Sequence, residues 1–139
     1  MADVAVLGGG AWGTALAQML ASDGRDVTLW ALEPEVVAEI NSDHCNTPFL
    51  PDAELAPSIR ATGDLADVAD AQVVLAVVPA QHLRSVLEKM PGFAGDLVIC
   101  AKGIEQSTGA LMSDAAHDAC PQATLAALSG PTFAHEVAA

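Results

Sequence analysis

The chain has 139 residues, of which 52% are hydrophobic, so it has the size of one domain and enough apolar material for a buried core. Its 5 basic and 18 acidic residues give a net charge of −13, which argues against nucleic acid and anionic membranes as partners, because both are bound through clustered Lys and Arg. Since no apolar run approaches the roughly 20 residues of a membrane span and no secretory signal pattern is seen, we expect a cytoplasmic protein.

The first predicted elements are a strand, a turn and a helix. Val4 to Leu7 is a short run rich in branched residues that ends in glycines, as a buried parallel strand does. Apolar residues then recur at helical spacing, and Gly24 stands where a left-handed cap would end the helix. A second strand is predicted over 26–31, and a second helix begins at Pro34 and runs to about residue 41.

The next part of the chain is less regular. Residues 44–57 contain three prolines together with Asn and Asp, which predicts a loop, and Phe49 and Leu50 are its expected apolar anchor. A weak strand is expected at 59–62 and a short helix at 64–69.

The remaining segments continue the alternation of strands and helices. We predict strands at 72–78, 96–101 and 124–129, and helices at 82–90 and 108–120. Continuous apolar strands that alternate with helices predict an α/β fold, here a Rossmann-type doubly wound parallel sheet with strand order 3-2-1-4-5-6. Since no repeat or linker divides the chain, residues 1–139 are expected to form one domain. In such a sheet the ligand binds at the carboxyl ends of the strands, beside strands 1 and 4.

Gly8, Gly10 and Gly13 form a GxGxxG pattern directly after the first strand and at the start of the first helix. The first glycine permits a tight turn, the second lets the backbone approach a pyrophosphate, and the third lets the helix pack close to the strand. The alternative is a turn that only connects the two elements. The strand, turn and helix context favours a site for NAD or NADP.

Glu33 follows Gly13 by 20 positions, close to the place where an acidic residue binds the ribose hydroxyls of the adenosine. No Arg or Lys lies between Asp26 and Arg60 to receive a 2′-phosphate, so the sequence favours NAD over NADP. The alternative is a surface glutamate just beyond the strand.

Two later segments also follow predicted strands. Lys102 and Gly103 come after the fifth strand, where an ammonium group would face the cleft shared by substrate and nicotinamide. A solvated lysine is the alternative. Residues 129–132 end the sixth strand in the same way and would place backbone N–H groups and a hydroxyl at the cleft, with a helix N-cap as the alternative.

No metal site is expected. Cys45, Cys100 and Cys120 are widely spaced without a CxxC pair, a pattern typical of reduced thiols. His135 and Glu136 begin like a zinc-protease motif, but Ala139 stands where its second histidine is required.

Several segments together resemble the amino-terminal domain of bacterial NAD(P)-dependent glycerol-3-phosphate dehydrogenase, in order over nearly the whole chain. They are GGGAWGTALA at 8–17, TLW at 28–30, PFLP at 48–51, VVP at 77–79, KGIE at 102–105 and LSGPTFAHEV at 128–137. The resemblance implies reversible hydride transfer between NAD(P)H and dihydroxyacetone phosphate, which gives sn-glycerol 3-phosphate for phospholipid synthesis.

The resemblance also assigns roles to individual residues. Besides the glycine turn, the residues expected to contact the cofactor are Ala11, Trp12, Phe49, Lys102 and Ala134. The residues expected to contact the substrate are Lys102, which would orient and polarise it, Gly130 and Thr132. Members of the family commonly have Ser at the position of Ala11 and an Arg soon after the strand-2 Trp, whereas this chain reads WALE at 30–33. The missing Arg again favours NAD.

In this family a helical carboxyl-terminal domain supplies the general acid and base, a second lysine, and the groups that bind the substrate phosphate. Because the chain ends at Ala139 inside a predicted helix without a cap signal, we expect a fragment that binds cofactor without turnover. A homodimer of the full enzyme is compatible with the resemblance. Two alternatives remain open: a stand-alone NAD-sensing module, and a related dehydrogenase that acts on a hydroxyacid or ketopantoate.

Overall fold

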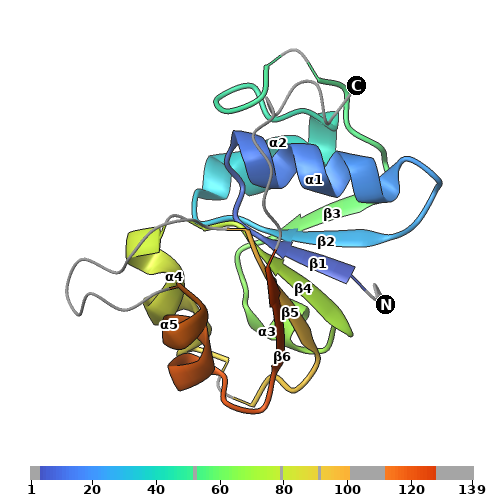
Figure 1. Cartoon of the computed structure of the whole chain (residues 1–139). Helices are drawn as coiled ribbons and strands as arrows, with labels where there is room; N and C mark the ends of the chain where they lie inside the picture. The colour runs from blue at the N-terminus through green and yellow to red at the C-terminus, as the bar shows by residue number, and fades with distance from the viewer. Residues whose placement is uncertain (1–3, 52, 79, 91, 101–111, 128–139) are drawn as a thin grey trace.

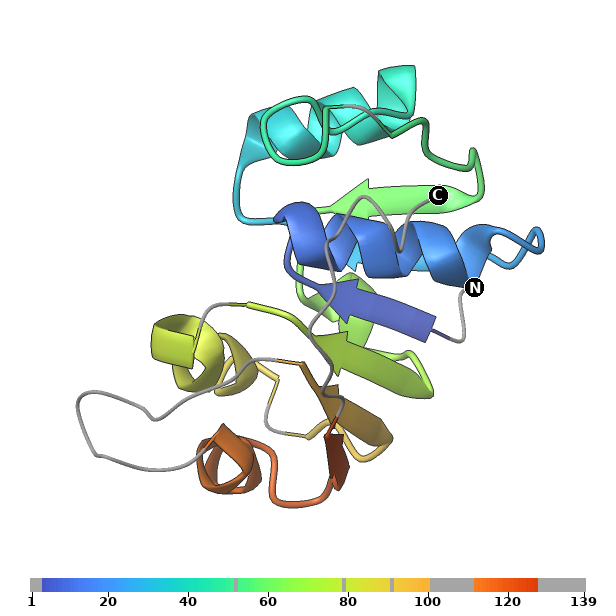
Figure 2. The same cartoon turned by 45° about the horizontal axis from the view of Figure 1, so that its top comes forward.

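A computed structural model describes residues 4–51, 53–78, 80–90, 92–100 and 112–127 of the chain. In this part of the chain six strands form one parallel sheet in the order β3-β2-β1-β4-β5-β6 (Figure 1). The strands are β1 (Val4–Leu7), β2 (Val27–Trp30), β3 (Ile59–Thr62), β4 (Val73–Ala76), β5 (Asp96–Ile99) and β6 (Thr124–Ala127). The predicted fold class and strand order are therefore confirmed, and Figure 2 shows the strands pointing the same way.

Helices cover both faces of the sheet. They are α1 (Ala11–Ala21), α2 (Pro34–Asp43), α3 (Ala66–Ala69), α4 (Ala80–Leu87) and α5 (Met112–Ala119). The α1 and α2 helices lie on one face, and α3, α4 and α5 lie on the other (Figures 1 and 2). Within the described ranges, none of these helices combines the length and the apolar character that crossing a membrane requires.

The strands are largely apolar because helices bury both faces of the sheet, although Arg60 of β3 and Asp96 of β5 are exposed. Val4 and Val6 of β1 pack into one cluster with Leu16 of α1, whereas Ala5 and Leu7 pack into a second cluster with Leu83 of α4. Successive side chains of a strand point to opposite faces, so one four-residue strand contributes to both cores.

Every predicted strand and helix is present, but several ends differ from the prediction. The β4 strand ends at Ala76 rather than at 78, because its neighbour β1 ends at Leu7. Beyond Ala76, the N–H of Val77 still donates to the Leu7 carbonyl, at 2.8 Å. The α4 helix ends at Leu87, and Met90 is held in the turn that follows by a bond from its N–H to the Leu87 carbonyl. Residues 108–111, predicted as helical, lie outside the described residues.

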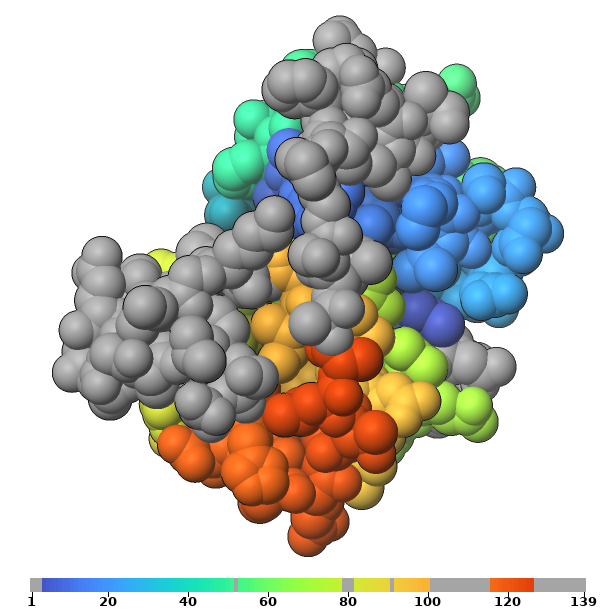
Figure 3. Space-filling view, in the orientation of Figure 1, coloured from blue at the N-terminus to red at the C-terminus, as the bar shows by residue number. Residues whose placement is uncertain are grey.

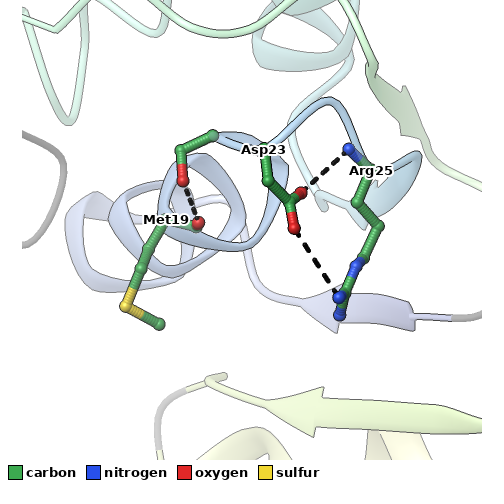
Figure 4. A network of polar contacts seen from close by, with 4 residues as sticks. Met19, Asp23 and Arg25 are labelled. Atoms are coloured by element: carbon green, nitrogen blue, oxygen red, sulfur yellow. Dashed lines mark hydrogen bonds and ion pairs between the residues drawn. The ribbon is translucent and has the colours of Figure 1, made fainter.

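The turn after α1 is closed by short-range polar contacts (Figure 4). The Ser22 hydroxyl donates to the Met19 carbonyl at 2.8 Å, and the Asp23 carboxylate accepts from the main-chain N–H of Arg25 at 3.1 Å. The Arg25 guanidinium lies 3.7 Å from the same carboxylate. Gly24 does adopt a left-handed conformation, φ +90°, but in this turn rather than at the cap, which is Ser22.

The α4 and α5 helices pack against each other near the β6 edge of the sheet. Arg84 of α4 and Asp118 of α5 form an ion pair at 3.2 Å. In the space-filling view, α5 and β6 (orange to red) and α1 (blue) occupy opposite parts of the face shown (Figure 3). The helices on the α4 side are thus joined to each other as well as to the sheet.

Candidate functional site

A cleft of about 510 Å³ lies at the carboxyl ends of β1, β2 and β4. Strands β1 and β4 are neighbours, but β1 leads to α1 on one face of the sheet and β4 leads to α4 on the other. The two connections diverge, and a doubly wound sheet binds its ligand at such a point. A second cavity, of about 480 Å³, has Asp26, Arg60 and Asp67 in its lining and no residue of β1 or β4. The cleft is therefore the candidate site.

The glycine turn forms the floor of this cleft. Gly8 has a φ of +126° and donates its N–H to the Trp30 carbonyl at 2.8 Å, and a Cβ at this position would lie 3.0 Å from the carbonyl carbon of Val77. A Cβ on Gly13 would collide with the carbonyl oxygen of Gly8. Both positions therefore require glycine, for backbone conformation and for close packing respectively.

The first turn of α1 presents backbone N–H groups to the cleft. Gly10 is the N-cap of α1, and no side chain caps the helix there. Thr14 is the first residue whose N–H reaches an acceptor of this helix, the Gly10 carbonyl at 3.0 Å, so Ala11, Trp12 and Gly13 have none within it. All three line the cleft. A helix N-terminus of this kind attracts an anion even in a chain of net charge −13, because the attraction is local.

The rim beyond β2 combines one carboxylate with apolar side chains. Glu33 is half-buried, lines the cleft and is the N-cap of α2, but its carboxylate caps no helix N–H. Leu32 and Phe49, which also line the cleft, are 76% and 40% exposed. Of the two residues expected to anchor the 44–57 loop, Leu50 alone is buried, and Phe49 is at the rim. Apolar side chains at the mouth of a cleft suit a flat apolar ring such as adenine.

The opposite wall comes from α4 and the turn after it, which sequence reasoning did not identify as part of the site. His82, Ser85, Val86 and Lys89 line the cleft. The first three share one face of α4 because they are three and four positions apart, and Lys89 lies in the turn after the helix, seven positions after His82. That spacing was visible in the sequence, but it could not show what the face meets. Lys89 therefore brings to the cleft a cation that lies outside the segment between Asp26 and Arg60, in which the sequence shows no Arg or Lys.

The structure brings together seven of the predicted cofactor contacts. Those that line the cleft are Gly8, Gly10, Ala11, Trp12, Gly13, Glu33 and Phe49. The other predicted site residues, Lys102, Gly130, Thr132 and Ala134, lie outside the described residues.

The cysteines do not line the cleft. All three are free, and burial raises the pKa of the Cys100 thiol to about 11 and also raises the pKa of the Cys120 thiol. A neutral buried thiol is a poor nucleophile, so these two residues are part of the packing. In the part of the chain that the structure describes, no cluster of three or more His, Cys, Asp or Glu side chains could hold a metal ion.

Comparisons with known proteins give one consistent family. The model described as NAD-dependent glycerol-3-phosphate dehydrogenase N-terminus matches residues 3–139. The glycerol-3-phosphate dehydrogenases [NAD(P)+] of Erythrobacter litoralis and Novosphingobium aromaticivorans are 62% and 64% identical to the chain, over 99% and 98% of its length. The chain spans only 42% and 41% of the length of these two proteins.

A solved structure agrees with the sequence relatives. The crystal structure of glycerol-3-phosphate dehydrogenase from Coxiella burnetii is similar to this chain with a TM-score of 0.88 and 32% identity. The similarity covers 97% of this chain and 42% of that one.

Proposed function

Since the chain belongs to the family of NAD-dependent glycerol-3-phosphate dehydrogenases and corresponds to their amino-terminal part, we propose that residues 1–139 form the NAD(P)-binding domain of such an enzyme. The observation that carries the proposal is the cleft in which the glycine turn, the first turn of α1, Glu33 and Phe49 meet. The family match favours a glycerol phosphate enzyme over the hydroxyacid and ketopantoate alternatives.

The residues of the cleft fit a dinucleotide. The N–H groups of Ala11, Trp12 and Gly13 would hold the pyrophosphate, which can approach because the space around Gly10 is open. The Glu33 carboxylate would accept hydrogen bonds from the ribose hydroxyls, and Phe49 would cover the adenine. Because backbone N–H groups would bind the pyrophosphate, this strongly acidic chain needs no cluster of basic side chains for an anion.

The proposed reaction of the whole enzyme is the interconversion of dihydroxyacetone phosphate and sn-glycerol 3-phosphate, which supplies glycerophospholipid synthesis. When bound, NAD(P)H provides the hydride for the carbonyl carbon, and the carbonyl oxygen takes up a proton. Lys102 is proposed to orient and polarise the substrate, Gly130 and Thr132 to contact it, and Ala134 to contact the cofactor.

The chain spans about two-fifths of its relatives, so the remaining groups are proposed to lie in a carboxyl-terminal domain. That domain would supply the general acid and base and the phosphate-binding groups, and the full enzyme is proposed to form a homodimer. The 139-residue chain by itself should bind cofactor without turnover. A cytoplasmic location is also proposed, in keeping with the three free cysteines.

The two tryptophans provide the test. Trp12 and Trp30 both line the cleft, and the chain has 2 Trp and no Tyr, so its emission reports on this place. Tryptophan emission overlaps the absorption of reduced nicotinamide, so bound NADH should accept energy from the tryptophans. Addition of NADH should therefore quench the tryptophan emission saturably and increase the nicotinamide emission excited through tryptophan. A chain that is folded by circular dichroism but shows no saturable quenching contradicts the proposal.

Two further measurements separate the alternatives. Addition of dihydroxyacetone phosphate to the chain with NADH should leave the nicotinamide absorbance unchanged, and enzyme-like oxidation would show that the chain needs no second domain. A native reading frame that continues beyond Ala139 into a helical domain excludes the stand-alone sensing module, and one that stops there favours it.

A further inference from the structure

Asn46 is a fully buried polar residue in the loop between α2 and β3, and neither the glycine motif nor its spacing points to it. Thr14 of α1 and Asn46 are the buried polar or charged residues of the described part of the chain. They are in contact, at 2.7 Å between the Asn46 Nδ2 and the Thr14 Oγ1. Burial of an amide is costly unless its hydrogen bonds are made, and in Asn46 the Nδ2 has partners whereas the buried Oδ1 has none in the described part of the chain. The partners of Nδ2 are therefore informative.

The second partner of Asn46 is the glycine turn itself. Nδ2 also donates to the carbonyl oxygen of Gly9, at 2.8 Å, from a position 37 residues further along the chain. A primary amide has two N–H groups, and both are used, one for Gly9 and one for Thr14. The Gly9 carbonyl is thereby held toward the interior of the protein.

The planarity of the peptide bond transmits this contact to the cleft. The carbonyl of Gly9 and the N–H of Gly10 belong to one trans peptide unit and point in opposite directions. With the carbonyl held inward by Asn46, the Gly10 N–H is turned outward. Gly10 is exposed and has no atom within 4 Å of the place of a Cβ, so an anion has room to approach beside this residue.

We propose that Asn46 is a positioning residue of the dinucleotide site, which orients the Gly10 N–H toward the pyrophosphate by holding the Gly9 carbonyl. The proposal rests on the proposed function, since it assumes a dinucleotide in the cleft. Asn46 also accepts a hydrogen bond from the Leu50 N–H, at 2.7 Å, on its main-chain carbonyl, and this contact beside Phe49 survives a change of side chain. A side-chain variant therefore affects the glycine turn more than the rim.

The test compares two asparagines. Asn46→Ala removes the nearer donor to the Gly9 carbonyl and leaves the Thr14 hydroxyl, at 3.4 Å, as the other. The control Asn41→Ala removes two hydrogen bonds of similar length, at 3.0 and 2.8 Å, which join α2 to Ala61 of β3 away from the cleft. Asn46→Ala should weaken the binding of ADP-ribose by about tenfold, as expected for loss of one hydrogen bond to a charged group. Asn41→Ala should leave that affinity unchanged even where it lowers stability.

The pyrophosphate dependence separates positioning from general loosening. Adenosine, which has no pyrophosphate, should bind equally to the wild-type chain and to Asn46→Ala when both are followed by nuclear magnetic resonance. The amide signal of Gly10 should shift on addition of ADP-ribose to the wild type and shift less in the variant. Equal losses for adenosine and ADP-ribose, or equal losses in the two asparagine variants, overturn the proposal.

An isosteric variant tests the role of Asn46 if Asn46→Ala does not fold. In Asn46→Asp a carboxylate cannot donate to Gly9, but a protonated carboxyl group can, so its ADP-ribose affinity relative to wild type should recover as the pH is lowered. A constant ratio of the two affinities counts against the proposal. If the wild-type chain itself binds no ADP-ribose, the proposed function fails, whereas binding that is identical in wild type and Asn46→Ala removes only the role of Asn46.

Discussion

The carbonyl oxygen of Gly8 occupies the space that a side chain on Gly13 would need. The two residues belong to the same glycine turn, and their contact sets how closely α1 approaches the end of β1. Gly10, between them in sequence, has open space around it. The three glycines of the motif are therefore under different structural constraints, and substitutions at Gly13 and Gly10 should have different effects.

Gly13→Ala should destabilise the fold. The new methyl group meets backbone rather than the end of a flexible side chain, so α1 must move away from β1, at a cost of roughly 1–3 kcal/mol or more for overpacking. Urea denaturation followed by circular dichroism measures the loss. A variant with wild-type stability would show that the helix adjusts freely.

Gly10→Ala should impair binding and spare the fold. Its φ of −74° and ψ of −174° are allowed for alanine and no atom obstructs the methyl group, so the free energy of unfolding should change by less than about 1 kcal/mol. The methyl group would, however, stand where the pyrophosphate approaches. Titration with NADH should show a loss of at least about tenfold in affinity, or about 1.4 kcal/mol. Unchanged affinity would place the phosphates elsewhere.

Glu33→Gln should reduce the discrimination between NADH and NADPH. The wild-type chain is expected to bind NADH more tightly, because a carboxylate near the adenosine ribose repels a 2′-phosphate by about 1 kcal/mol at 4 Å in water. The neutral variant should gain several-fold in NADPH affinity by calorimetry. Equal or tighter binding of NADPH to the wild type contradicts the preference for NAD.

Lys89→Gln should have the opposite effect on NADPH. Lys89 lines the cleft on the wall opposite Glu33 and is a cation that a 2′-phosphate can use. The variant should bind NADPH several-fold more weakly, with a smaller dependence on salt, while NADH binding changes less. An equal loss of affinity for NADH and NADPH would mean that Lys89 contacts a part of the dinucleotide that both cofactors have.

The stability of the chain should fall in alkaline solution. Burial raises the pKa of Cys100 from 9.0 to about 11, so between these values the unfolded chain releases a proton that the folded chain retains. The free energy of unfolding therefore falls as the pH rises through this window, by up to about 2–3 kcal/mol, and the effect is absent below it. Urea denaturation across the window should show a smaller fall in Cys100→Ala. The same fall in both chains would assign the effect to other groups.

Local sequence determined much of the fold. Short local patterns specify the elements, as the branched runs of β1 and β4 and the turn at Gly8 show. Because crossovers between parallel strands are right-handed, few strand orders then remain possible. The ends of elements were less predictable, as β4 shows, because the length of a strand depends on where its neighbour β1 stops. The roles of Gly8 and Gly13 were also readable, since the positive φ of Gly8 and the contact of Gly13 with the Gly8 carbonyl both arise within one turn.

The tertiary structure decided what surrounds that turn. Asn46 reaches the Gly9 carbonyl from 37 residues away, and Lys89 meets the same cleft as Glu33 from the turn after α4. Neither pairing has a local signal, because an asparagine in a loop and a lysine after a helix are common in any sequence, and only the packing of α4 and of the 44–57 loop brings these two to the site. The sequence by itself thus determined the backbone motif that can hold a dinucleotide, whereas the side chains that orient and charge its cleft depend on how distant segments pack.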